Sequence, residues 1–186
     1  MKNFIKQLKN PFTEEYNILK EDVLNVNFLW NYKGTTDPKL NLNSERYSAN
    51  PMYQHCIVTA VDVSPNFLVP RIDSQYAELA FIVIKQILSY NNIEHTQIHR
   101  CVVNQIHYWD GKPSPPHLDH DTLSHKNCII YLNHFDDGQI DVYSDDGDIE
   151  SYKPMQDDII TFDGYNHSIH QPAPMQRRVC IVFTYS

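Results

Sequence analysis

One stretch in the first half of the chain has a clear helical pattern. Its apolar side chains recur three or four residues apart and share one stripe, formed by Tyr76, Ala80, Val83, Ile84 and Ile87. Asp73 or Ser74 can cap the first turn, and two asparagines follow Tyr90. The pattern predicts an amphipathic helix over residues 75–90 that packs on the outside of a sheet.

From residue 97 onward the pattern changes to short runs of β-branched and aromatic residues, which are separated by turns rich in Gly, Pro and Asp. These runs predict strands at residues 99–109, 127–133, 139–143, 149–152, 158–162, 168–171 and 178–185. Regular short strands with turn signals between them favour a β-sandwich or a barrel.

The remainder of the first half is less regular. Residues 1–10 predict one or two amphipathic turns, and near-alternation of apolar and polar positions predicts a strand within residues 16–31. A further strand is expected at residues 56–63. Residues 33–54 are polar and few of them are aliphatic, which indicates a long loop. Because long loops in compact domains are often functional, we expect a lid or a wall of a substrate site here.

The length and composition fit one soluble domain. A chain of 186 residues can bury a sizeable core, and its apolar (41%) and charged (20%) contents are those of a globular protein. We therefore expect a single domain over residues 1–186. Residues 1–96 would supply N-terminal strands, the loop and the supporting helix, and residues 97–186 would form the β core that carries the chemistry.

The charge and the N-terminus narrow the classes of partner and the location. A net charge of −8 argues against tight nucleic-acid binding, which needs clustered Lys and Arg. Residues 1–10 are basic without a continuous apolar run, which does not resemble a signal peptide. No apolar stretch approaches the roughly 20 residues of a membrane span. We expect a cytoplasmic protein without membrane contact, in the host-cell cytoplasm if the chain is phage-encoded.

The cysteines favour the same location. They are far apart, mostly in apolar strand-like contexts, and no CxxC motif occurs. Buried reduced thiols are expected in a cytosolic protein rather than disulfides or a zinc site. The four positions are Cys56, Cys101, Cys128 and Cys180.

The densest group of potential metal ligands lies in residues 115–121, directly behind a proline-rich turn. In an extended segment, His117 and Asp119 point to one side and the residue between them to the other. Two imidazoles and one carboxylate are the ligand set of mononuclear iron(II) oxygenases. His167, which follows a predicted strand and a turn, is the expected third ligand, and His170 is an alternative.

Other polar residues have weaker claims. His134 and Asp136 repeat the HxD spacing, but they enter a turn where surface groups are expected. His120 and Asp121 are expected to hydrogen-bond around the site or to face the substrate. Because HxD arises easily by chance, the signal is strong only together with the ordered strands, histidine and arginine downstream.

That ordered set resembles a known family. The run His117-Leu-Asp119 is followed by Ile129-Ile-Tyr131-Leu-Asn133, then by Phe162-Asp-Gly164 with His167, and then by Arg177-Arg178 in an apolar strand. It is similar to the 2-oxoglutarate/Fe(II)-dependent oxygenase superfamily, and most similar to its prolyl-4-hydroxylase-like subgroup, which includes short phage and bacterial members. The resemblance covers residues 97–186. It implies a double-stranded β-helix, a cupin-like jelly roll in which helices buttress one sheet.

The resemblance also implies residue roles. The iron ligands would be His117, Asp119 and His167. Arg178 would pair with the distal carboxylate of 2-oxoglutarate, a task that suits a planar fork of donors. Arg177, with the opposite strand parity, is the alternative anchor. Tyr131 resembles a tyrosine that helps to hold the same carboxylate, and Tyr108 resembles an aromatic residue near the cosubstrate.

The implied activity is hydroxylation of an unactivated C–H bond, with Fe(II), 2-oxoglutarate as cosubstrate, O2, and ascorbate as a reductant. Succinate and CO2 would be released. A peptidyl proline, another protein side chain and a small molecule all remain candidate substrates. The alternatives are a cupin-like metalloprotein that does not use 2-oxoglutarate, and a non-catalytic binding module on the same barrel. The acidic turns within residues 136–158 are expected to be solvated, or to favour a basic substrate.

Overall fold

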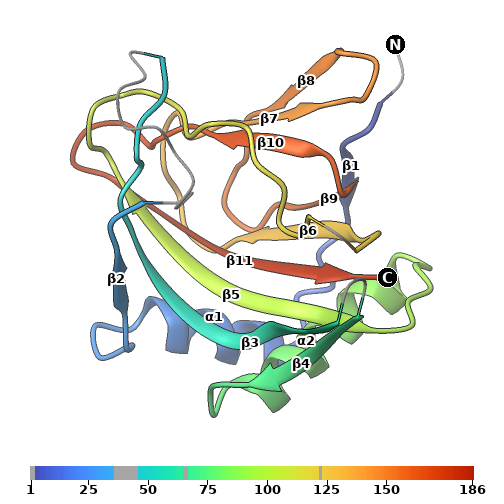
Figure 1. Ribbon diagram of the computed structural model, residues 1–186. Coiled ribbons are helices and arrows are strands. Elements are labelled where there is room, and N and C mark those ends of the chain that lie inside the picture. The colour runs from blue at the N-terminus through green and yellow to red at the C-terminus, as the bar shows by residue number, and fades with distance from the viewer. Residues whose placement is uncertain (1–2, 36–45, 65–66, 122) are drawn as a thin grey trace.

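The computed structural model of the protein describes residues 3–35, 46–64, 67–121 and 123–186. In these ranges the chain forms two helices and eleven strands (Figure 1). In chain order they are β1 (Lys6–Leu8), α1 (Glu14–Leu24), β2 (Asn31–Lys33), β3 (Met52–Ser64), β4 (Phe67–Ile72), α2 (Ala77–Tyr90), β5 (Ile98–His107), β6 (Lys126–Tyr131), β7 (Ile140–Tyr143), β8 (Ile149–Tyr152), β9 (Ile159–Asp163), β10 (Asn166–Ile169) and β11 (Arg177–Tyr185).

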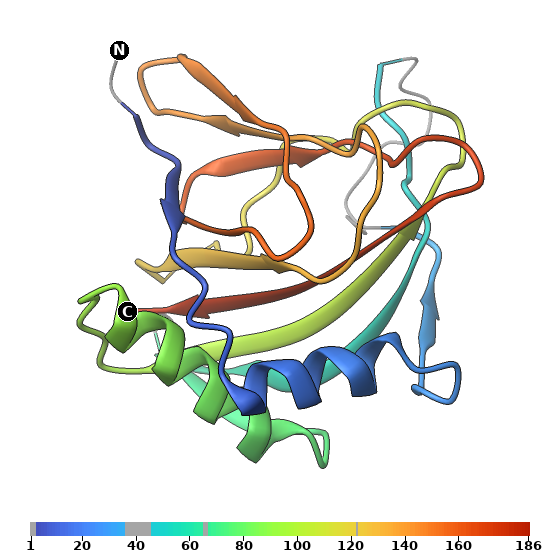
Figure 2. The same ribbon diagram turned by 180° about the vertical axis from the view of Figure 1, so that it is seen from behind.

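The strands form two antiparallel sheets. The larger sheet has eight strands in the order β1-β9-β6-β11-β5-β3-β2, with β4 paired to β3, and the smaller has the order β10-β7-β8. The smaller sheet lies across from β6, β9 and β11 (Figures 1 and 2). Apolar side chains from both sheets fill the space between them, among them Ile129, Val142 and Val182.

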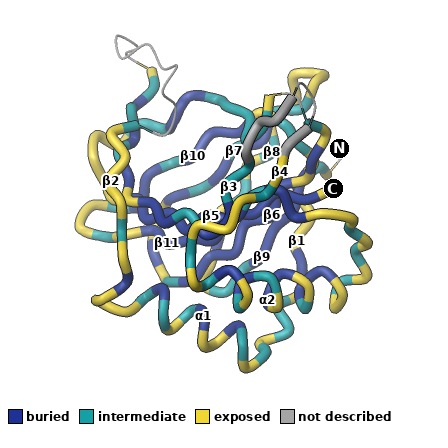
Figure 3. The backbone as a smooth tube through the Cα atoms, turned by 60° about the horizontal axis from the view of Figure 1, so that its bottom comes forward, coloured by how far each residue is buried: buried dark blue, intermediate teal, exposed yellow. Residues whose placement is uncertain are grey.

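The helices cover the opposite face of the larger sheet (Figure 2). Successive side chains of a strand point to opposite faces, so one strand serves two cores. In β11, Val179, Ile181 and Phe183 pack in the core that contains the helices. Cys180 and Val182 pack in the core between the sheets. The central strands β5, β6 and β11 are accordingly coloured as buried along most of their length in Figure 3.

The second half of the chain confirms the sequence-based expectation. All seven strands predicted after residue 97 are present, and their ends differ from the predicted ones by at most two residues. The strand expected at residues 56–63 is also present within the longer β3. The predicted helix is α2, whose stripe of Ala80, Val83, Ile84 and Ile87 is buried.

The strand predicted within residues 16–31 is wrong. Residues 14–24 are the helix α1, in which the hydroxyl of Thr13 accepts a hydrogen bond from the backbone N–H of Tyr16 at 3.2 Å. Tyr16, Leu19 and Val23 are its buried residues, at the spacing of one helical face. The alternation noted from Leu24 onward falls mostly in the connection that follows, and only β2 pairs as a strand.

The turns predicted for residues 1–10 are also wrong, because β1 pairs with β9 and forms the edge of the larger sheet. The carboxylate of Glu150 fastens the residues before β1, accepting hydrogen bonds from the backbone N–H groups of Phe4 (2.6 Å) and Ile5 (3.0 Å). The pairing with β9 explains why a segment of three residues without a clear sequence pattern forms a strand. The middle of the predicted loop, residues 36–45, lies outside the described residues, and its two ends belong to β2 and β3.

The expected free thiols are confirmed: all four cysteines are unpaired, and three of them are buried. None of the helices in the described part of the chain has the length and apolarity to span a membrane.

Candidate metal centre

The loop after β5 and the strand β10 meet at two histidines. The backbone N–H of His117 donates to the carbonyl of His167 at 3.1 Å, and the N–H of His167 donates to the carbonyl of His117 at 3.0 Å. This isolated β-bridge places the two ring centroids 4.5 Å apart. Two of the predicted ligands are therefore held side by side by backbone hydrogen bonds, although they are far apart in the sequence.

The rings of His117 and His167 are held in the same way, each by a contact of its Nδ1 with a backbone carbonyl. Nδ1 of His117 lies 3.0 Å from the carbonyl of Pro115, and Nδ1 of His167 lies 3.2 Å from the carbonyl of Tyr165. A carbonyl oxygen only accepts, so Nδ1 carries the proton in each ring and Nε2 keeps its lone pair. Such a bond from the remote ring nitrogen is how protein surroundings orient metal-binding histidines.

Asp119 is the third predicted ligand. Its Oδ2 lies 3.8 Å from Nε2 of His167, and this buried oxygen has no hydrogen-bond partner. Burial raises the pKa of Asp119, but the positive charge of Arg100 and the neighbouring histidines outweigh burial and hold that pKa well below its usual range. Burial, with His117 beside the ring, lowers the pKa of His167 to about 4. A charged carboxylate and a neutral imidazole are the protonation states that a metal ion requires.

The donor set fits iron(II) chemically, since it offers two imidazole nitrogens and one unpartnered carboxylate oxygen. As they stand, no three His, Cys, Asp or Glu side chains of the described residues are arranged closely enough to hold a metal ion. The structure therefore places His167 beside His117 and also near Asp119. The role of the three residues as ligands stays a prediction.

The second predicted feature, the anion anchor, lies deeper between the sheets. Arg178 is fully buried, and its guanidinium carbon stands 5.1 Å from the centroid of the Tyr131 ring. Nη2 of Arg178 lies 3.4 Å from the Tyr131 hydroxyl, which is a weak contact. Nε and Nη1 have no partner, and no ion pair links this guanidinium to a carboxylate of the described residues.

The alternative anchor lies on the other side of the strand. Arg177 is exposed, and its Nη1 donates to the side-chain oxygen of Gln105 at 3.1 Å. Tyr131 is buried beside Arg178, whereas Tyr108 is 43% exposed and lies over the turn at Gly111. The roles of all these residues toward a cosubstrate stay predictions.

The weaker candidates are occupied elsewhere. Nε2 of His170 lies 2.7 Å from a carboxylate oxygen of Asp141, outside the group of three. His134 and Asp136 are exposed in the turn after β6, as expected. Nε2 of His120 lies 2.7 Å from the hydroxyl of Thr184, so this ring hydrogen-bonds beside the site.

Sequence reasoning missed two residues. Nη1 of Arg100 donates to Oδ1 of Asp119 at 2.6 Å. Asn127 is fully buried, both its amide atoms lack a partner, and it pairs across the strands with Thr184. Both are polar residues next to apolar positions of central strands. That contrast is the signal that could have singled them out.

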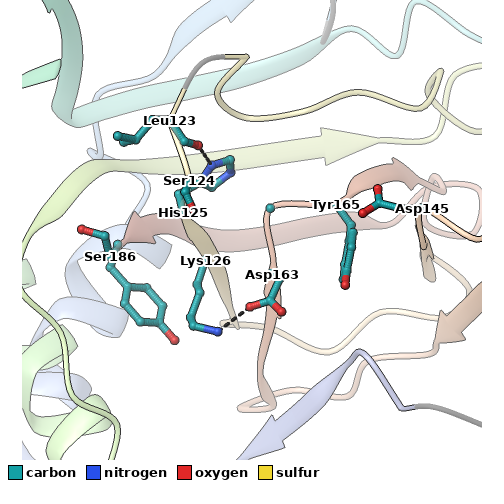
Figure 4. A pocket seen from close by; sticks show the side chains of 10 residues that line it. Leu123, Ser124, His125, Lys126, Asp145, Asp163, Tyr165 and Ser186 are labelled. Atoms are coloured by element: carbon teal, nitrogen blue, oxygen red, sulfur yellow. Dashed lines mark hydrogen bonds and ion pairs between the residues drawn. The ribbon is translucent and has the colours of Figure 1, made fainter. Parts of the chain in front are cut away.

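A cavity of about 450 Å³ lies near the group, although none of the three candidate ligands lines it; its lining side chains are shown in Figure 4. Tyr165 lines it and accepts the hydrogen bond from Nδ1 of His167. His125 lines it from the other side, with its ring 4.7 Å from that of His120. Lys126 and Asp163 form an ion pair in its wall. The whole lining is Leu123, Ser124, His125, Lys126, Asp145, Asp163, Gly164, Tyr165, Tyr185 and Ser186.

Neither a family model nor a curated protein gives a match to the sequence. Solved structures do match, along nearly the whole chain. A 2OG-Fe(II) oxygenase family oxidoreductase from Burkholderia pseudomallei is 14% identical, with a TM-score of 0.68, over 98% of this chain and 85% of that one. A Pseudomonas putida prolyl-4-hydroxylase is 16% identical, with a TM-score of 0.58, over 98% and 92%.

A third match is a prolyl hydroxylase from Trichoplax adhaerens, in complex with a peptide fragment of the hypoxia inducible factor oxygen degradation domain. It is 14% identical, with a TM-score of 0.58, over 98% of this chain and 83% of that one. These likenesses confirm the predicted fold: the chain is mainly β, with two helices in its described part, and has the double-stranded β-helix of 2-oxoglutarate/Fe(II) oxygenases.

Proposed function

We propose that the protein is a 2-oxoglutarate- and Fe(II)-dependent dioxygenase that hydroxylates an unactivated C–H bond and releases succinate and CO2. The observation that carries the proposal is the buried guanidinium of Arg178. It has two unpartnered nitrogens and no carboxylate beside it in the described structure. Burying a cation without a counter-ion is costly, so the site calls for an anionic ligand. The distal carboxylate of 2-oxoglutarate matches a guanidinium fork.

The chain's own residues would then divide the work. His117, Asp119 and His167 would hold the iron, with each ring fixed by the hydrogen bond of its Nδ1 to a backbone carbonyl. Arg178 would bind the distal carboxylate, and the hydroxyl of Tyr131 would donate to the same group from the side. The apolar side chains between the sheets would exclude water. Bound iron(II), with 2-oxoglutarate and O2, supplies the oxidant for the C–H bond.

The fold likeness to prolyl hydroxylases, one of them with a bound peptide, supports a protein side chain as substrate, with peptidyl proline the first to test. Such a segment would bind in or near the cavity whose wall includes Tyr165, the residue whose backbone carbonyl contacts Nδ1 of His167. Its mixed lining of an ion pair, tyrosines and Asp145 suits a polar substrate rather than an apolar one.

The test is conversion of 2-oxoglutarate to succinate by purified protein with Fe(II) and ascorbate. We expect turnover by the wild type and none by His167→Ala. Arg178→Met should lose cosubstrate binding, whereas the adjacent exposed Arg177→Met should keep it. Absence of turnover and of iron binding in the wild type would refute the proposal. Iron binding by the wild type that does not respond to 2-oxoglutarate would indicate a metalloprotein that does not use it.

A further inference from the structure

Arg100 lies at the edge of the proposed metal site without being a candidate ligand. It is in β5, directly across from Thr184 of β11. Its Nη1 donates to Oδ1 of Asp119 at 2.6 Å, and the two side chains are 24% and 10% exposed. Thr184 bonds the next residue of the loop, His120, at 2.7 Å. Arg100 and Thr184, which are paired across β5 and β11, thus both hold the loop of Asp119 and His120 against the larger sheet.

This contact makes the two oxygens of Asp119 different. Oδ1 is engaged in a short, charge-assisted hydrogen bond, whereas Oδ2 is buried, unpartnered and 3.8 Å from Nε2 of His167. A carboxylate can bind a metal ion through one oxygen or through both. A two-histidine, one-carboxylate site works because several metal positions stay open. A carboxylate that binds through both oxygens would close one of them.

We propose that Arg100 is a positioning residue that holds Asp119 as a one-oxygen metal ligand and so keeps one coordination position open. The inference rests on the proposed function. It assigns Arg100 a role that its charge alone would not predict. A cation this close weakens the attraction of the site for a metal ion. Removing Arg100 removes this repulsion together with the hydrogen bond to Asp119. We therefore expect a change in how many Asp119 oxygens bind the metal rather than a large change in metal affinity.

The test measures the water molecules on bound Mn2+, a stand-in for iron(II), by water-proton relaxation. In Arg100→Met, which has no donor, we expect one fewer exchangeable water than in the wild type. The Mn2+ dissociation constant should change by less than the roughly tenfold that loss of an outer partner often causes. Arg100→Lys keeps a charged donor and should restore the wild-type water number. Arg100→Gln, which is neutral, should behave like the Met variant and replaces it if that variant does not fold.

Arg71 provides a matched control. It forms an exposed ion pair with Asp73 at 2.7 Å, so Arg71→Met removes an Arg–Asp pair away from the site and should leave the water number unchanged. An Arg100→Met protein with the wild-type number of waters would overturn the inference. A wild type that binds Mn2+ no better than His167→Ala would instead refute the proposed function, so the two failures are distinguishable.

Discussion

Arg178→Met should make the protein more stable in the absence of cosubstrate, although it should destroy cosubstrate binding. In the free protein the guanidinium is fully buried, and Nε and Nη1 have no partner. Each unsatisfied buried donor costs about 1–3 kcal/mol. The unbranched Met side chain can fill much of the same space. The losses on removal are the weak 3.4 Å contact with the Tyr131 hydroxyl, which would then be unpaired, and the cation–π contact with the ring of the same residue at 5.1 Å.

The balance favours the variant. Replacing a buried ion pair by apolar residues of similar volume is often neutral or stabilising by about 1–4 kcal/mol, and Arg178 has no carboxylate partner in the described structure to lose. In a chain of this size, a change of 1 kcal/mol shifts the unfolding midpoint by about 2–4 °C. We therefore expect the midpoint of Arg178→Met to lie a few degrees above that of the wild type. Thermal unfolding followed by circular dichroism measures it, with Arg177→Met as the exposed control.

When 2-oxoglutarate and Mn2+ are added, the wild type should have a higher unfolding midpoint than Arg178→Met. Ligand at 100 times its dissociation constant stabilises the native state by about 2.7 kcal/mol, and only the wild type should gain this. If Arg178→Met is less stable than the wild type without ligand while Arg177→Met is unchanged, the guanidinium has partners in the free protein. The reasoning from unpaired donors to an anion site would then be wrong.

Three further substitutions test the fold and the site. Gly164→Ala should destabilise by about 1–3 kcal/mol in urea unfolding, because its Cβ would lie 2.8 Å from the His125 ring; Gly34→Ala, with nothing within 4 Å, is the control. Thr13→Ala should cost about 1 kcal/mol of unfolding free energy through loss of the α1 cap, and Thr13→Ser should retain most of it. His170→Ala should leave Mn2+ affinity unchanged in titration calorimetry, and a large loss would make His170 a ligand.

The sequence was most informative where structure is decided by local pattern. In β11, strand parity alone predicts that Arg178, Cys180 and Val182 share a face, and the structure places Cys180 and Val182 in the core between the sheets. Strand parity could not decide which arginine faces inward until the neighbouring sheet was known. In the structure Arg178 is buried and Arg177 is exposed, so Arg178 is the arginine that faces inward.

Local pattern failed in the N-terminal region because two signals overlap there. The helical face of Tyr16, Leu19 and Val23 runs directly into an alternating stretch, so a strand predicted across both covers the residues that form α1. β1 and β2 are three residues each, too short to show any period. Such edge strands depend on a partner that is distant in sequence, as β1 depends on β9.

The contacts that surround the candidate ligands are less visible in the sequence than the ligand pattern itself. A ligand pattern such as His117 and Asp119 lies within one segment, whereas the Arg100–Asp119 contact depends on the path of a loop and on the register of β5 against β11. The sequence does show polar residues at positions where the apolar neighbours predict burial. Asp119, Asn127 and Arg178 all keep buried atoms without a partner in the described structure. Asn50, His99 and His125 do so as well. Because nearly all buried polar groups in proteins are paired, the unpaired atoms of Asp119 and Arg178 are the ones that the proposed metal and cosubstrate would complete.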